Sequence, residues 1–259
     1  LVSGTAGTGK TTLAAHFADA ACRRGEKVLF LAFEESGSQI VRNMRSVAVD
    51  LEPWAKKGLL QFNNTSPTHC GLELHLAIIY KLIDDFDPHV LVLDPMSNLT
   101  SVGRTWEVKA LFIRLIGLLK QRNITGLFTN LNYSGGRAEQ AEMGVSSLMD
   151  TWIVLQGIES DGEVNRTLKI VKSRGMEHSN QLREFVLTRS GVDLLDVYLG
   201  DGKWVMGTAR AGEEARKHAE DVERARNIES RRRQVEQERE DVKAQIAVLE
   251  AQLESKEEE

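Results

Sequence analysis

The chain has 259 residues, 41 % of them hydrophobic, and a formal net charge of −5, which allows one large globular domain with an appended segment. Only two cysteines are present, which excludes a disulfide framework and favours a reducing cytoplasm, and no stretch is apolar and long enough to span a membrane. Acidic and basic side chains balance over residues 1–211, so this part carries no electrostatic footprint for nucleic acid.

Residues 4–12 match the phosphate-binding P-loop pattern G-x-x-x-x-G-K-[ST], with the end of a strand predicted at 1–3 and a helix at 13–18. The glycines let successive backbone N–H groups point at one phosphate, and the helix N-terminus adds its dipole. Lys10 is predicted to contact the β- and γ-phosphates of ATP, and Thr11 to bind Mg²⁺. Because the motif begins at residue 4, we expect the chain to be part of a longer protein. The nucleotide-binding residues predicted here are Thr5, Gly7, Thr8, Gly9, Lys10, Thr11 and Thr12.

Two apolar runs end in carboxylates. Lys27–Phe33 reads as a buried parallel strand that leads into Glu34 and Glu35, and a second apolar run ends at Asp94 in the manner of a Walker B strand. Asp94 is predicted to bind Mg²⁺ directly or through water. Carboxyl ends of parallel strands face the ligand crevice, so one glutamate is a candidate to activate a nucleophile beside the γ-phosphate. The alternative is that both glutamates merely begin the next helix.

The remaining pattern alternates strands and helices and then continues with strands alone. It predicts an α/β fold with a parallel sheet that is extended by antiparallel strands. Asn130, at a strand end, either senses the γ-phosphate or caps a turn. Helices are expected at 38–47, 72–86 and 107–121, and strands at 59–63, 90–94, 124–130, 152–155, 166–172 and 183–188.

Beyond Gly212 the composition changes, because glycine and proline vanish and Glu, Arg, Ala and Gln dominate. We therefore predict two parts, 1–211 and a helical tail, 212–259. The tail has an imperfect heptad pattern, with Arg232 and Arg239 at a positions, and predicts an intermolecular coiled coil rather than a lone solvated helix. The apolar seam positions are Ala225, Ile228, Val235, Val242, Ile246, Leu249 and Leu253.

With these residues in hand, residues 1 to about 205 resemble the KaiC family of RecA-like ATPases, and within it the second of two tandem domains. The resemblance rests on four segments, residues 3–11, 32–36, 124–130 and 172–175. It implies a RecA-like fold and a ring, usually a hexamer, with ATP and Mg²⁺ between subunits. It also implies that the domain phosphorylates its own serine or threonine residues in circadian or timer-type signalling.

Carried over by position, the resemblance makes Glu34 the general base and Glu35 its partner. Glu34 is also expected to be a metal ligand, with Thr11 and Asp94. Lys172 and Arg174 would reach ATP held by the adjoining subunit, with Arg166 nearby. Without the resemblance, an exposed strand end would be the favoured interpretation of these cations. The implied phosphoacceptors are Ser146 and Ser147, and the implied ATP contacts at this end of the chain are Arg166, Lys172, Ser173, Arg174 and Gly175.

Three departures from the family limit the carry-over. Ala141 stands where the family has a threonine five residues before the first acceptor, and Val47 stands where a tryptophan lies near the adenine. A long predicted coiled coil replaces the short peptide on which KaiA acts, so KaiA dependence is in doubt. We expect the coiled coil to join subunits or stacked rings, a KaiB-like protein is a candidate partner, and neither nucleic acid nor a membrane is expected.

Two other classes of function remain open. A RecA-like DNA-dependent ATPase, a recombinase or helicase, would share the fold and the ATP site, although the neutral core and the serine pair disfavour it. A nucleotide-gated scaffold assembled through the coiled coil is the second, and intact Lys10, Glu34 and Asp94 disfavour an inactive site.

Overall fold

The computed structural model describes residues 1–64, 70–132, 146–160, 163–196, 198–200 and 203–257. The chain divides into two compact units, residues 1–197 and 198–259, and each is described by itself. Within the described ranges, no helix is both long and apolar enough to cross a membrane.

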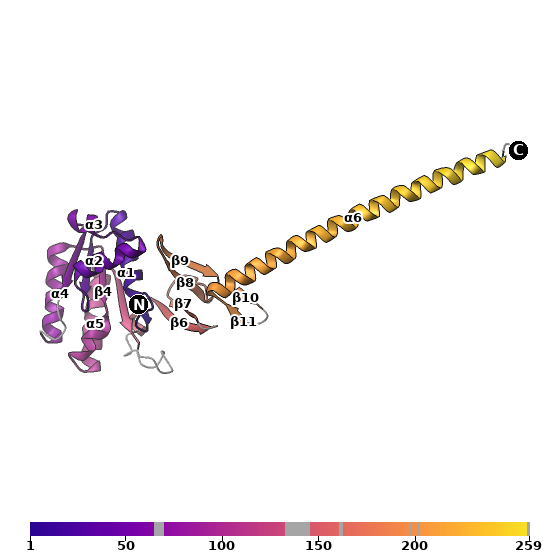
Figure 1. The fold of residues 1–259 in the computed structure, drawn as a ribbon. Coiled ribbons are helices and arrows are strands. Elements are labelled where there is room, and N and C mark those ends of the chain that lie inside the picture. Colours follow the sequence, from indigo (N-terminus) through magenta and orange to yellow (C-terminus); the bar gives the residue numbers. More distant parts are fainter. Residues whose placement is uncertain (65–69, 133–145, 161–162, 197, 201–202, 258–259) are drawn as a thin grey trace. The chain divides into compact units, whose positions relative to one another are not determined.

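The first unit is built on a nine-stranded sheet in the order β3-β2-β4-β5-β1-β6-β7-β8-β9 (Figure 1). Neighbours from β3 to β6 are parallel, and β6 to β9 form an antiparallel meander. The predicted α/β fold with a mostly parallel sheet is therefore confirmed. The strands are β1 Val2–Gly4, β2 Val28–Ala32, β3 Leu60–Asn64, β4 Val90–Asp94, β5 Thr125–Leu131, β6 Thr151–Ser160, β7 Glu163–Ser173, β8 Arg183–Thr188 and β9 Gly191–Asp196.

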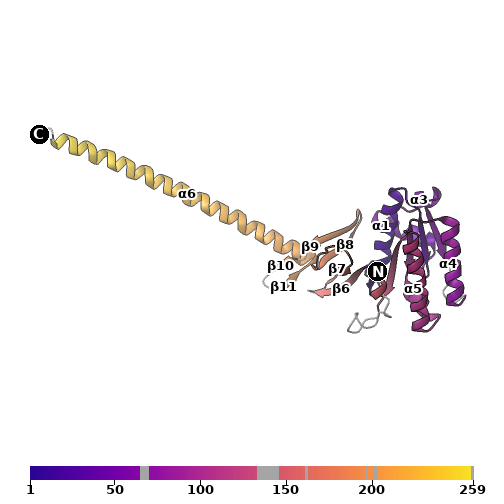
Figure 2. The ribbon, with the colours of Figure 1, turned by 180° about the vertical axis from the view of Figure 1, so that it is seen from behind.

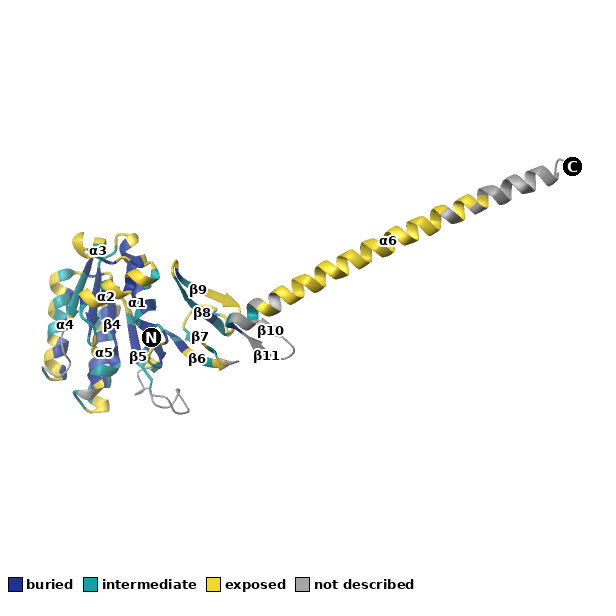
Figure 3. Ribbon diagram, in the orientation of Figure 1, coloured by how far each residue is buried: buried dark blue, intermediate teal, exposed yellow. Residues whose placement is uncertain are grey.

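Helices cover both faces of the parallel part of the sheet, as the two opposite views show (Figures 1 and 2). Phe30 of β2 packs toward α1, α2 and α3, whereas its neighbours Leu29 and Leu31 pack toward α4 and α5. A strand buried on both faces must be apolar throughout, which is why these strands read as continuous apolar runs. Figure 3 shows the buried strands between helices with exposed outer faces. The helices are α1 Lys10–Arg23, α2 Gly37–Met44, α3 Glu52–Lys56, α4 Leu72–Phe86 and α5 Thr105–Gln121.

Strand β1 lies in the middle of the sheet, between β5 and β6. The chain leaves β1 through α1 to reach β2, beyond β5 and β4, whereas β6 pairs on the other side of β1. This reversal of direction is a topological switch point, and ligands of open α/β sheets bind outside the carboxyl ends of the strands there. A ligand site is therefore expected at the segments that follow β1, β2 and β4.

The second unit contains the antiparallel pair β10 Tyr198–Gly200 and β11 Lys203–Val205, followed by α6 Gly207–Glu257, a helix of 51 residues. The seam positions Ile228, Val235 and Val242 are 64 %, 57 % and 53 % exposed. None of the residues that the structure describes covers these side chains, and pairing with a second helix stays a prediction. The side chains of Leu249 and Leu253 lie outside the described residues.

Candidate functional site

The P-loop curls because two of its glycines adopt backbone angles that other residues avoid. Gly7 and Gly9 have φ values of +77° and +97°, in the left-handed region. At Gly9 a Cβ atom would also lie 2.8 Å from Cε1 of Phe185 in β8, which is closer than carbon atoms approach. Gly9 immediately precedes α1, so the loop delivers the backbone to a helix N-terminus, where anions bind.

Lys10 is buried at 8 % exposure beneath this loop. Its Nζ donates to the carbonyl oxygens of Gly4 at 2.9 Å and Thr5 at 2.7 Å. Burial lowers the pKa of the Lys10 ammonium, whereas the negative charges of Asp94 and Glu34 oppose that fall. Charged groups predicted from three separate motifs thus come together at one place.

Asp94 is the buried acid of this group, 7 % exposed. Its carboxylate accepts hydrogen bonds from the hydroxyls of Thr129 in β5 and Thr11 in α1. Burial raises the pKa of the Asp94 carboxyl above its ordinary value, and these two hydrogen bonds work against the rise. Lys10, Thr11, Glu34, Asp94 and Thr129 are called the P-loop cluster below.

The oxygens of Asp94 and Thr11 fit the hard-ligand preference of Mg²⁺. Among the described residues, no group of three or more His, Cys, Asp or Glu side chains is arranged to hold a metal ion. A cation at Asp94 and Thr11 would therefore need further oxygens from water or from the nucleotide, as Mg²⁺ in P-loop sites commonly has.

The two glutamates after β2 have different surroundings. Oε2 of Glu35 accepts a hydrogen bond from Nδ2 of Asn43 in α2 at 3.0 Å, whereas Glu34 is exposed and interacts with Lys10 and Asp94 through its charge. The N-cap of α2 is Ser36, whose hydroxyl accepts from the backbone N–H of Gln39 at 3.3 Å. The helix start is thus capped by Ser36 and Gln39 without Glu34, whose charge acts on Lys10 and Asp94.

Arg166 of β7 lies beside the P-loop of its own chain. Its Nε donates to the carbonyl oxygen of Gly7 at 3.0 Å. Lys172 is six positions further along the same strand, about 20 Å away at about 3.3 Å per residue. The structure therefore separates Arg166 from Lys172 and Arg174, which the sequence interpretation had placed together.

The other two cations hold the segment that carries the predicted acceptors, η4 Ser146–Leu148. Nζ of Lys172 donates to the carbonyl oxygen of Ser146, and Nη2 of Arg174 donates to that of Ser147, both at 2.6 Å. Ser146 is half-buried and Ser147 is exposed. Residues predicted from distant parts of the sequence are thus in direct contact.

Asp150 completes this second group. Its Oδ1 lies 3.1 Å from Nζ of Lys120 in α5 and 3.9 Å from Nη1 of Arg174. Burial, followed by the positive charge of Arg174, lowers the pKa of Lys172. The hydroxyl of Ser173 bonds to that of Thr151 at 3.0 Å, which ties β7 to the start of β6. Ser146, Ser147, Asp150, Lys172 and Arg174 are called the acceptor cluster below.

Strand register places the two clusters at opposite ends of the sheet. Gly4, which begins the P-loop, pairs with Leu155 of β6, and Arg166 pairs with Gly157. At the other end of β6, Thr151 pairs with Ser173. The P-loop cluster therefore follows the carboxyl ends of the parallel strands, and the acceptor cluster lies at their amino ends.

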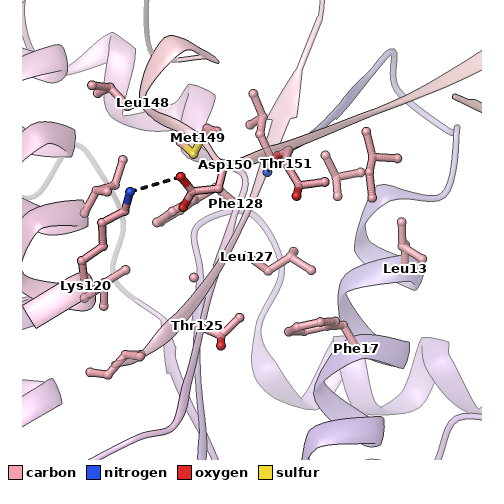
Figure 4. Close-up of a pocket in the computed structure, with 17 residues that line it drawn as sticks. Leu13, Phe17, Lys120, Thr125, Leu127, Phe128, Leu148, Met149, Asp150 and Thr151 are labelled. Atoms are coloured by element: carbon pink, nitrogen blue, oxygen red, sulfur yellow. Dashed lines mark hydrogen bonds and ion pairs between the residues drawn. The ribbon is translucent and has the colours of Figure 1, made fainter. Parts of the chain in front are cut away.

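A pocket of about 620 Å³ opens between α1, α5 and β5 (Figure 4). Its walls are mainly apolar, with Phe17, Leu127 and Met149 among them, and the Lys120–Asp150 ion pair lies at one side. Because β5 contributes its first residues, the pocket lies at the acceptor end of the sheet. It is separate from the P-loop cluster.

Three further residues were singled out in the sequence, and the structure places two of them. Asn130 is buried, and its Nδ2 donates to Oδ1 of Asn132 at 3.1 Å, so its role toward a phosphate stays a prediction. Val47 packs against the core on the α1 side of the sheet, in η1 Arg45–Val47. Ala141 lies outside the described residues.

A P-loop at the switch point of a mostly parallel sheet, with a second strand ending in a buried aspartate beside it, defines a RecA-like P-loop nucleotide-binding domain. The sequence model of one family, described as "ATPase: KaiC", matches residues 1–197. The chain therefore belongs to the KaiC ATPase family, as the resemblance in the sequence predicted.

Individual relatives agree with this assignment. The chain is 47 % identical to the "Circadian clock protein KaiC2" of Synechocystis sp. (strain ATCC 27184 / PCC 6803 / Kazusa) over an alignment that covers 100 % of this chain and 46 % of that protein. It is 35 % identical to the "Circadian clock oscillator protein KaiC" of Thermostichus vulcanus, over 80 % of this chain and 40 % of that protein. The chain thus spans less than half the length of these relatives. The alignment to KaiC2 includes the helical tail.

Proposed function

We propose that this chain is the part of a KaiC-like clock or timer protein that hydrolyses ATP and phosphorylates serines of a neighbouring copy. The membership of the KaiC family and the likeness to proteins named for the circadian clock support the general role. Support for the chemistry comes from the P-loop cluster and the acceptor cluster.

The arrangement of the two clusters carries the proposal. Within one chain the acceptor cluster lies at the opposite end of the sheet from the P-loop, so Ser146 and Ser147 cannot meet an ATP bound to their own P-loop. Transfer then requires two chains, the P-loop end of one facing the acceptor end of the next. Such head-to-tail contacts close into a ring, which for this family we take to be a hexamer.

The P-loop cluster supplies binding and the base. Backbone N–H groups of the P-loop and Lys10 hold the phosphates of ATP, with Thr5, Thr8 and Thr12 in the same loop and helix start. Thr11 and Asp94, with Glu34 close by, would hold Mg²⁺, which supplies charge neutralisation at the phosphates. Glu34, whose charge acts on Lys10 and Asp94 of this site, takes the proton of the attacking hydroxyl.

In the transfer step a bond forms between Oγ of the serine and the γ-phosphorus. The bond from the γ-phosphorus to the β–γ bridging oxygen breaks, ADP leaves, and the hydroxyl proton passes to Glu34. Lys172 and Arg174 of the acceptor chain stabilise the developing phosphoryl charge, with Ser173 and Gly175 shaping the turn that carries them. If water attacks in place of the serine, the same groups give ATP hydrolysis.

The tail extends the proposal to assembly. An apolar stripe along α6 is exposed in the single chain, and pairing with a second α6 would remove it from water. We propose that paired tails join subunits or rings and take over part of the regulation of phosphorylation. Truncation before Ala225 tests this, and an unchanged assembly size with unchanged phosphorylation would contradict it.

The test of the central proposal is intact-mass and peptide analysis after incubation with Mg-ATP. We expect phosphate on Ser146 or Ser147, lost in Glu34→Gln and in the double variant Ser146→Ala/Ser147→Ala. Glu35→Gln is the matched control and should retain the phosphate. ATP hydrolysis without phosphoserine would reject the kinase, and stimulation of that hydrolysis by DNA would favour a recombinase-type motor.

A further inference from the structure

Lys172 and Arg174 have two roles that cannot both be filled at once. They already donate to the acceptor segment of their own chain, and the proposed function needs them at the ATP of a neighbour. We propose that, once Ser146 or Ser147 carries a phosphoryl group, Lys172 and Arg174 of the same chain bind that phosphoserine and leave the neighbouring nucleotide. This inference rests on the proposed function, because it concerns the product of that reaction.

Lys172 and Arg174 already lie close to the acceptor serines of their own chain. Nζ of Lys172 and Nη2 of Arg174 are each 2.6 Å from the carbonyl oxygen of an acceptor serine, so the hydroxyls of these serines lie within reach of a side-chain rotation. An ammonium has three N–H donors and a guanidinium has five. Both cations can therefore contact a phosphoryl group on the segment that they already touch, without movement of the main chain.

The carboxylate now beside Arg174 would compete only weakly with a phosphoserine. Among the described residues, Asp150 is the carboxylate paired with Arg174, at 3.9 Å, and both side chains are more than half exposed. An exposed pair at that distance contributes little. A phosphoserine carries a charge of about −1.5 to −2 at pH 7 and three strong acceptor oxygens, so it attracts the guanidinium more strongly than Asp150 does.

Asp150 also retains a partner after the exchange. Its Oδ1 is closer to Nζ of Lys120, at 3.1 Å, than to Arg174, and Figure 4 shows this pair at the side of the pocket. Arg174 can therefore turn to a phosphoserine while the Lys120–Asp150 pair stays in place. The exchange leaves no charge of the cluster without a counter-ion.

The consequence is a reaction that limits itself. A phosphorylated chain withdraws its two cations from the ATP of its neighbour, and phosphoryl transfer or hydrolysis at that site slows. Loss of a cation supplied in trans lowers rates by about 10³–10⁵ in arginine-finger systems. Phosphoserine that holds the two cations should therefore lower turnover by up to about 10³–10⁵, the full loss of the trans cations being the limit.

Binding is tested in the full chain with phosphoserine installed at position 147 during synthesis, so that no kinase activity is needed. A ³¹P NMR titration should give a second phosphate pKa clearly below the ordinary value of about 6. Lys172→Gln and Arg174→Gln should return it toward that value, and Lys169→Gln, an exposed lysine of the same strand, should not. A pKa equal to that of the urea-unfolded chain would overturn the proposal.

Withdrawal is tested by the initial rate of ATP turnover of the same phosphorylated chain, with the same preparation after phosphatase treatment as the reference. Equal turnover by the two would overturn the regulatory half of the proposal even if the titration shows binding. Failure of the proposed function looks different. In that case unmodified protein forms no phosphoserine in Mg-ATP, while the titration of installed phosphoserine still reports whether the two cations bind it.

Discussion

The two ends of the central sheet hold charges in different ways. In the P-loop cluster, Lys10 and Asp94 are 8 % and 7 % exposed, and partners within the same chain satisfy them. In the acceptor cluster, the side chains of Asp150 and Arg174 are 57 % and 54 % exposed. A buried charge must be neutralised inside its own chain, whereas a charge left at the surface can be used by a second molecule.

The largest effect on ATP turnover should come from variants that disable one cluster, because the proposed reaction needs the P-loop cluster of one chain and the acceptor cluster of another. We expect Arg174→Ala to lower ATP turnover by about 10³–10⁵, because the cation acts in trans. A one-to-one mixture of Arg174→Ala and Glu34→Gln chains should regain about a quarter of wild-type turnover, since random assembly restores one interface in four. The measurement is phosphate release after the subunits have been exchanged.

The comparison would fail if mixing restored nothing while both variants assembled normally. The two clusters would then act within one chain, in conflict with the strand register. Mixing either variant with Lys169→Gln chains, an exposed change elsewhere on β7, serves as the control for subunit exchange.

Within the P-loop cluster, the two glutamates should differ strongly. Glu34→Gln should slow phosphoryl transfer by about 10²–10⁴, the usual contribution of a general base. Glu35→Gln should have a much smaller effect, because Glu35 is bonded to Asn43 of α2. The rate of phosphoryl transfer in a single turnover measures both effects. Similar losses for the two variants would show that the assignment of Glu34 as the base is wrong.

The next effect is on stability, and it should be larger in the P-loop cluster than in the acceptor cluster. Thr129→Val keeps the shape of a fully buried side chain but removes the donor to Asp94, and the free energy of unfolding should fall by about 1–3 kcal/mol. It should also raise the pKa of Asp94 further, because a bond that opposed the rise is lost. Urea denaturation near neutral pH checks the first effect. No change would show that the bond contributes nothing.

In the acceptor cluster the matching change should be mild. Asp150→Asn removes the counter-ion of Lys120 and Arg174, yet these are exposed pairs. The free energy of unfolding should therefore fall by only about 0–1 kcal/mol. Denaturation in low and high salt measures it, and a loss as large as that of Thr129→Val would remove the distinction between a buried and a surface cluster.

The smallest effect concerns pH. His16 of α1 has a buried Nε2 without a hydrogen-bond partner, and burial lowers the pKa of its imidazole below 6.5, with the nearby charge of Asp19 opposing. The unfolded chain therefore takes up the proton first, and the free energy of unfolding falls as pH drops below about 6.5. His16→Gln should flatten this dependence, whereas His178→Gln, in the loop after β7, should leave it intact.

Much of the P-loop cluster could be predicted because its motifs are local. Lys10 and Asp94 follow from a glycine-rich loop and an apolar strand, and the helix at 72–86 ends where predicted because Asp87-Pro88 stops it. Thr129 and the position of Arg166 could not be predicted, because they depend on how β5 pairs with β4 and β7 with β6. That register is set by long-range packing, which no local pattern encodes.

The contacts of the acceptor cluster and the edge strand β9 could not be predicted from local sequence patterns either. Lys120 and Asp150 are thirty residues apart in sequence and meet only when α5 packs beside the start of β6. Strand β9 was not predicted, because most of its residues are exposed and give no apolar alternation. The resemblance to a known family supplied Ser146, Ser147, Lys172 and Arg174, and the structure supplied Asp150 and the contacts among them.

Strand β7 carries a cation at each end, with Arg166 on the P-loop of its own chain and Lys172 on the acceptor segment. In a ring of the proposed kind, each β7 would thus be a rigid spacer between one ATP site and the next. Influence along it would have a direction, because the two ends of the strand differ. A subunit with a distorted β7 would then impair two ATP sites, its own and that of one neighbour, while the neighbour on the other side kept its full rate.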